Sequence, residues 1–203
     1  MSIKNIIFDF GQVIVHFDPK YMTGVYISDE ADKAFVSNVL FDRLYWDRLD
    51  LGTISDEETL EKCHERLPSR LWDICDKIYY DWVYNIPVIE GMDKLLPYLK
   101  ERYGVRLFLI SNISKYFVSH KEDIPILKEF EYCVFSSDLG VCKPSPIIFD
   151  HLLRTCSLER SESIFIDDNK SNIEGAIGFG LHGYLFDGDA ERLKSYLDKL
   201  LSE

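Results

Sequence analysis

Three apolar runs of this sequence are each followed directly by carboxylate or hydroxyl side chains. They are 3–8 before Asp9, 105–110 before Ser111, and 163–166 before Asp167 and Asp168. A carboxylate can attack phosphorus, a hydroxyl can donate to a phosphate oxygen, and neighbouring carboxylates can hold a divalent cation. These residue types indicate phosphoryl transfer, provided that the fold brings them together.

Short apolar runs of this kind predict buried strands of a parallel sheet, and the amphipathic stretches between them predict helices. The expected strands are 3–8, 105–110, 132–136, 163–166 and 183–186, and the expected helices are 91–103, 146–156, 171–179 and 189–201. This alternation predicts a doubly wound, mostly parallel, Rossmann-like α/β sheet. All its strands end at one edge, so the polar side chains listed above are predicted to converge there.

A helical segment is expected to interrupt this pattern after the first strand. Asp18 before Pro19 is typical of a helix start, and Ser55 with Glu58 forms a capping-box pattern. The expected helices are 28–41, 55–67 and 69–84, the last with one apolar face made of Trp72, Cys75, Ile78, Tyr79 and Trp82. We therefore predict an α/β core domain of residues 1–16 and 88–203, and a helical cap domain of residues 17–87.

Composition excludes several classes of protein. The chain has 203 residues, 46% of them hydrophobic, with no apolar run near 18 residues, so a membrane span is not expected. A formal charge of −12 disfavours nucleic acid as a partner. Five widely spaced cysteines indicate neither a disulfide framework nor a zinc site. The apolar run before Asp9 is too short for a signal peptide, which predicts a cytoplasmic protein.

In chain order, Asp9, Ser111, Lys143 and the pair Asp167-Asp168 resemble the four motifs of the haloacid dehalogenase-like (HAD) hydrolase superfamily. The helical segment resembles the C1-type cap of that superfamily. The resemblance implies that Asp9 is the nucleophile of an aspartyl-phosphate intermediate.

The motif residues also predict how phosphate and metal are held. Ser111, the backbone N–H of Asn112, and Lys143 are the expected phosphate donors. An oxygen-only set of ligands fits Mg²⁺. We expect direct ligation by Asp9 and Asp168 and ligation through water by Asp167, and the resemblance adds the backbone carbonyl of Gly11.

Gly11 departs from the motif, because most phosphatases of the superfamily have a second aspartate there as general acid and base. Loss of a positioned proton donor typically lowers the rate by roughly 10²- to 10⁴-fold. The stretches Phe-Asp-Phe-Gly-Gln-Val-Ile-Val and Leu-Gly-Thr-Ile-Ser-Asp-Glu resemble a bacterial subgroup that includes a glucose-1-phosphate phosphatase with the same glycine. The proton is then expected from His16, Asp18, a residue of the helical segment, or water.

Three functions stay open on the sequence. The first is a Mg²⁺-dependent phosphatase of a small phosphorylated metabolite, with a sugar phosphate favoured, acting as a monomer or homodimer. The second is a metal-independent haloacid dehalogenase, which the acidic pair Asp167-Asp168 disfavours. The third is a non-catalytic protein that binds a phosphorylated ligand, which Gly11 favours.

The positions of some side chains have two possible interpretations. Tyr45, Trp46, Arg48 and Asp50 either face the crevice or pack within the helical segment. Asn172 either orients the acidic pair or lies on a helix surface.

Overall fold

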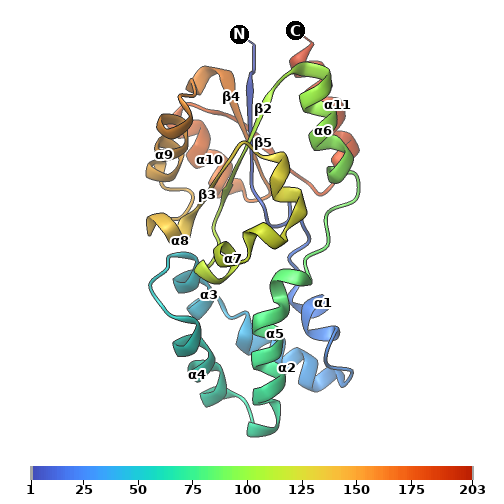
Figure 1. The fold of residues 1–203 in the computed structure, drawn as a ribbon, viewed down its shortest axis with the longest axis vertical. Helices are drawn as coiled ribbons and strands as arrows, with labels where there is room; N and C mark the ends of the chain where they lie inside the picture. Colours follow the sequence, from blue (N-terminus) through green and yellow to red (C-terminus); the bar gives the residue numbers. More distant parts are fainter. Residues whose placement is uncertain (1, 203) are drawn as a thin grey trace.

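The computed structural model describes residues 2–202 and has a five-stranded parallel sheet at its centre (Figure 1). The strands are β1 (Asn5–Phe8), β2 (Arg106–Ser111), β3 (Tyr132–Phe135), β4 (Ser163–Asp167) and β5 (His182–Leu185). Their order in the sheet is β3-β2-β1-β4-β5. This order confirms the predicted doubly wound α/β fold, with bounds that differ from the prediction by one or two residues.

Helices cover both faces of the sheet. Alternate residues of β1 point to opposite layers, as expected for a strand: Ile6 and Phe8 join one apolar cluster, and Ile7 joins the other. The first cluster includes residues of α6 (Met92–Tyr103) and α11 (Ala190–Leu201), and the second includes residues of α9 (Pro146–Cys156) and α10 (Lys170–Phe179). The central strands β1, β2 and β4 are therefore buried on both sides, which explains their apolar runs, whereas the edge strand β5 is partly exposed.

The helical segment lies beyond the C-terminal edge of the sheet (Figure 1). Its α-helices are α1 (Pro19–Gly24), α2 (Glu30–Leu40), α3 (Arg43–Asp50), α4 (Asp56–Arg66) and α5 (Trp72–Asp81). The expected starts are confirmed for α1, where Asp18 accepts from two backbone N–H groups, and for α4, where Ser55 accepts from the N–H of Glu58. The helix α3 was not predicted as a separate element.

Two expectations for residues 69–84 are wrong. The stretch is not one helix, because 3₁₀ turns at Ser69–Leu71 and Trp82–Tyr84 flank α5. Trp72 is 40% exposed instead of sharing the buried face of α5. Its indole N–H donates to the carbonyls of His64 and Leu67, which draws the ring to the end of α4.

The connection from β2 to β3 contains short elements that the sequence pattern did not predict. They are α7 (Lys115–Ser119) and the 3₁₀ turns η3 (Lys121–Asp123) and η4 (Pro125–Glu129). After β3 the chain forms α8 (Ser136–Leu139), and a further 3₁₀ turn, η5 (Arg160–Glu162), precedes β4. No helix within residues 2–202 combines the length and the apolar composition that crossing a membrane requires.

Candidate active site

The strand order brings the motif residues to one place. β1 lies between β2 and β4, and Phe8 is in register with Leu109 on one side and Ile166 on the other. Asp9, one residue beyond β1, therefore emerges beside Asp167 at the end of β4, and its backbone N–H donates to the carbonyl of Ile166. Ser111 ends β2 on the other side. The predicted convergence at the C-terminal edge is what the structure shows.

Lys143 joins two of these carboxylates. Its Nζ lies 2.6 Å from Oδ1 of Asp9 and 2.8 Å from Oδ2 of Asp167, and the Lys143 side chain is 1% exposed. Burial by itself lowers the pKa of Lys143, but the two carboxylates outweigh burial, and the net pKa is raised. Lys143 therefore stays protonated in the interior.

Asn112 fixes the backbone that carries Lys143. The Asn112 side-chain oxygen accepts from the N–H of Lys143 at 2.8 Å, and its amide group donates to the Lys143 carbonyl at 3.3 Å. The sequence suggested only the backbone N–H of Asn112, as a phosphate donor. The role of its side chain was missed, because a partner 31 residues away is not visible in local patterns.

Asp167 is fully buried, and three groups donate to it. Besides Lys143, these are the backbone N–H of Asn169 at 2.8 Å and the amide of Asn172, at 3.2 and 3.0 Å from the two carboxylate oxygens. Asn172 is itself buried. The structure therefore supports a role for Asn172 in orienting the acidic pair, and not a position on the helix surface.

The three aspartates form a cluster of oxygen ligands. One carboxylate oxygen each from Asp9, Asp167 and Asp168 lies within 4.8 Å of the other two, and Asp168 is exposed toward solvent. Three ionised carboxylates and the Lys143 ammonium would leave two negative charges uncompensated. A hard divalent cation with oxygen ligands fits both the donor set and this charge.

The pKa of Asp9 also reflects its surroundings. Burial raises this pKa, Lys143 lowers it and Asp167 raises it again, with a net value of about 7. A cation held by the same cluster would favour the ionised carboxylate, which is the form that can act as a nucleophile.

A cavity of about 200 Å³ lies over these groups, between the sheet edge and the helical segment. Its walls contain all of the predicted site residues except the buried Asp167, and they also contain Asn172. From the helical segment come Phe17, Arg43, Trp46, Asp50, Trp82 and Ile86. Of the four crevice candidates only Trp46 and Asp50 reach this cavity, and His16 and Asp18 do not line it either. Arg43 was missed, because it is also a surface arginine, 74% exposed and paired with Asp47 at 2.6 Å, and nothing in the sequence set it apart.

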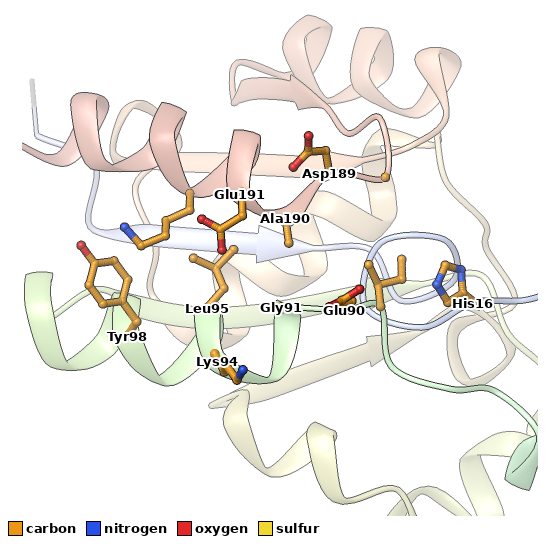
Figure 2. A pocket seen from close by; sticks show the side chains of 12 residues that line it. His16, Glu90, Gly91, Lys94, Leu95, Tyr98, Asp189, Ala190 and Glu191 are labelled. Carbon is orange, nitrogen blue, oxygen red and sulfur yellow. The ribbon is translucent and has the colours of Figure 1, made fainter.

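A larger cavity, of about 670 Å³, lies elsewhere and contains none of the motif residues. It opens between the N-terminal ends of α6 and α11, near His16 (Figure 2). Two lysines, Lys94 and Lys194, line it. Lys194 is already paired with Asp198 at 2.6 Å, and the hydroxyl of Tyr98 donates to the same carboxylate. The smaller cavity is therefore the candidate active site.

Comparisons with known proteins show the family of the chain. The family model described as haloacid dehalogenase-like hydrolase matches residues 3–180. A D-ribitol-5-phosphate phosphatase of Bacteroides thetaiotaomicron is 30% identical over 190 residues, which cover 84% of this chain and 85% of that protein.

Solved structures share the fold. A predicted HAD-like family hydrolase from Porphyromonas gingivalis superposes with a TM-score of 0.75 at 23% identity, covering 100% of both chains. A HAD family enzyme from Bacteroides thetaiotaomicron, solved with magnesium and inorganic phosphate, has a TM-score of 0.69 at 20% identity, covering 95% of this chain and 99% of that one.

Proposed function

The chain belongs to the haloacid dehalogenase-like hydrolases, and from this we propose that it is a Mg²⁺-dependent phosphatase of a small phosphorylated polyol or sugar. The observation that carries the proposal is the position of Asp9. This carboxylate is held by a buried lysine at 2.6 Å, belongs to a cluster of three aspartates, and opens into a cavity. Each feature serves a carboxylate that attacks phosphorus.

The proposed reaction has two steps on Asp9. A carboxylate oxygen of Asp9 attacks the phosphorus atom, and the bond from phosphorus to the leaving oxygen breaks. Water then attacks the aspartyl phosphate and releases inorganic phosphate. Lys143 holds Asp9 in place and lies close to the charge that develops on the phosphoryl oxygens, and Ser111 and Asn112 line the same cavity as donors.

Asp9, Asp168 and the carbonyl of Gly11 are the proposed direct ligands of Mg²⁺. Asp167 already accepts from three groups, which supports ligation through water for this residue. When bound, Mg²⁺ neutralises and orients the phosphoryl group.

The cavity and one relative support the proposed substrate class. A volume of about 200 Å³ suits a small leaving group. Its walls combine the rings of Phe17, Trp46 and Trp82 with the charged groups of Arg43 and Asp50, a mixture that suits a carbon chain bearing several hydroxyls. The relative at 30% identity is named for a phosphorylated polyol.

Residues 17–87 are proposed to act as the cap of this site, because they supply one wall of the cavity and shield it from water. The cytoplasmic location and the choice between monomer and homodimer stay predictions from the sequence.

The test is a panel of phosphorylated polyols and sugars assayed for phosphate release with Mg²⁺. We expect turnover that EDTA abolishes and added Mg²⁺ restores. Asp9→Asn should lower turnover by at least about 10³-fold, because it removes the nucleophile, while circular dichroism and the melting temperature show a folded protein.

Two outcomes would contradict the proposal. Chloride release from a 2-chloroalkanoic acid in EDTA, without phosphatase activity, would favour the dehalogenase. The cluster of three carboxylates speaks against this outcome, because a metal-free site has no reason to concentrate negative charge. Tight binding of phosphate esters with no turnover would favour the binding protein.

A further inference from the structure

An alkoxide leaving group needs a proton, and Gly11 has no side chain to supply one. The titratable groups that line the cavity are Asp9, Arg43, Asp50, Lys143 and Asp168. Asp9 is the proposed nucleophile, Asp168 is a proposed metal ligand, Lys143 is paired with two carboxylates, and an arginine does not give up its proton. Asp50 is the one group in this set without another assignment.

The Asp50 side chain is buried without a partner. The residue is 5% exposed, and its Oδ1 atom has no hydrogen-bond partner among residues 2–202. A buried polar atom is nearly always paired, because leaving it unpaired costs free energy. Oδ1 itself has almost no accessible surface, but the residue lines the cavity, and no hydrogen bond or ion pair among residues 2–202 holds its carboxyl group. The carboxyl group of Asp50 is therefore free to bond with a molecule in the cavity.

The core fixes the position of Asp50, although the residue comes from α3. The hydroxyl of Ser136, directly after β3, donates to the backbone carbonyl of Asp50 at 2.6 Å. The same hydroxyl accepts from the N–H of Ile113, two residues after the end of β2, at 2.9 Å. One serine therefore ties the end of α3 to the edge of the sheet that bears the motif residues.

We propose that Asp50 is the catalytic acid and base of this phosphatase, supplied by the helical segment in place of the side chain that Gly11 lacks. The inference rests on the proposed function. In the first step the Asp50 carboxyl gives its proton to the leaving oxygen as the bond to phosphorus breaks, which yields the free alcohol and the aspartyl phosphate. In the second step the Asp50 carboxylate takes a proton from water as the water oxygen attacks phosphorus, which releases phosphate and restores both aspartates.

The environment of Asp50 suits both roles. Burial raises the pKa of Asp50 to about 7, an effect that exceeds the opposing influence of Arg43 and Lys143. Both protonation states are then populated near neutral pH, as an alternating acid and base requires.

The test compares two leaving groups in Asp50→Asn. A polyol phosphate releases a poor leaving group that needs a proton, whereas 4-nitrophenyl phosphate releases one that does not. We expect kcat/KM of Asp50→Asn to fall by roughly 10²- to 10⁴-fold for the polyol phosphate and by less than about 10-fold for the aryl ester. The variant should also show a burst of 4-nitrophenol of up to one equivalent, because hydrolysis of the aspartyl phosphate then lacks its base.

Two variants serve as controls. Asp73→Asn makes the same chemical change at an exposed residue of α5, outside the cavity, and should leave both activities unchanged. Gly11→Asp should restore activity toward the polyol phosphate in the Asp50→Asn background. A Cβ at residue 11 meets no clash, since it would lie 3.9 Å from its nearest neighbour, Cβ of Phe17.

The outcomes separate this inference from the proposed function. A wild-type protein that hydrolyses no phosphate ester overturns the proposed function itself. An active wild type whose Asp50→Asn variant loses both esters equally, or loses neither, overturns only the role of Asp50. Selective loss of the polyol phosphate with rescue by Gly11→Asp supports it.

Discussion

At the scale of single residues, the site is organised by one buried cation. Lys143 lies between Asp9 and Asp167 with little solvent around it, so its charge is poorly screened. Removal of either carboxylate would still leave the ammonium group paired, whereas removal of the lysine would leave two carboxylates facing each other. The lysine compensates one of the three acidic groups that lie within 4.8 Å of one another, and a bound divalent cation would compensate the other two.

Asp50 should make the stability of the protein depend on pH. Its pKa is raised to about 7 in the folded protein, above the value of about 4 expected when unfolded. Below about pH 4 the carboxyl is protonated in both the folded and the unfolded protein and does not oppose folding. As the pH rises through about 7, its ionisation favours the unfolded protein, so the free energy of unfolding falls. The groups whose charges influence this pKa are Asp9, Arg43, Asp47 and Lys143.

Asp50→Asn should consequently stabilise the protein at high pH. We expect a free energy of unfolding close to that of the wild type near pH 4, and roughly 1–3 kcal/mol above it at pH 8. Urea denaturation at several pH values measures the difference, with the exposed Asp73→Asn change as the control. A gain that is equal at pH 4 and pH 8 would argue against a buried carboxyl at this position.

The sequence predicted correctly that the motif residues converge, because parallel strands must end at one edge. It could not predict the amide side chains that fix them. Asn112 binds the backbone of Lys143, and Asn172 binds Asp167, across loops whose paths depend on tertiary packing. Asp50 was one of four candidates from the helical segment, and only the structure shows that its Oδ1 is buried and unpaired.

Helices and strands were predicted correctly where one local sequence signal, such as a capping residue or a regular apolar spacing, was strong. Helix α9 begins and ends at the predicted residues, with Ser145 as its N-cap and Pro146 in its first turn. The predicted helix of residues 69–84 failed because 3.6-residue periodicity does not distinguish an α-helix from an α-helix flanked by 3₁₀ turns. The short elements between β2 and β3 are too brief to show any periodicity.

Helix α10 positions the loop that carries Lys143 through a close contact at Gly175. A Cβ added at Gly175 would lie 2.6 Å from Cβ of Pro144 and 2.9 Å from its carbonyl oxygen. Gly175→Ala should therefore displace Pro144 and, with it, Lys143. We expect a loss of roughly 1–3 kcal/mol in stability and a fall of about 10- to 100-fold in kcat/KM.

Gly178 in the same helix is the matched control, because an added Cβ there meets nothing within 4 Å. Gly178→Ala should raise stability by about 0.5–1 kcal/mol, since alanine is the better helix former, and leave kcat/KM unchanged. Thermal denaturation and steady-state kinetics measure both variants. Full activity in Gly175→Ala would show that the loop tolerates the displacement.

At the scale of the whole molecule, the helical segment and the core share an aromatic seam beside the site. Trp82 stacks on Phe117 with ring centroids 5.7 Å apart, and Phe117 packs against Phe10 at 5.1 Å. Phe17 contacts both Trp46 and Trp82. Since this seam adjoins the cavity, a shift of the helical segment would move the cavity wall and Asp50 together.

Gly52 lies where the loop after α3 approaches the core. Substitution of this glycine tests whether catalysis depends on the contact between the helical segment and the core. The φ of Gly52 is 68°, and an added Cβ would lie 2.8 Å from the backbone oxygen of Ser137 in the core. Gly104 has a nearly equal φ of 65° with nothing within 4 Å, so Gly104→Ala carries the same backbone strain without the clash. Each alanine should cost about 1–2 kcal/mol of stability for its left-handed backbone.

Activity should distinguish the two variants. Gly52→Ala pushes the loop after Asp50 away from the core, so we expect kcat/KM for a polyol phosphate to fall by about 10-fold or more. Gly104→Ala lies at the end of α6 and should keep wild-type kinetics below its melting temperature. If both variants lose activity equally, lowered stability accounts for the loss. If Gly52→Ala keeps full activity, catalysis does not depend on the position of α3 relative to the core. Such a result would contradict the proposal that Asp50, on this helix, donates the proton.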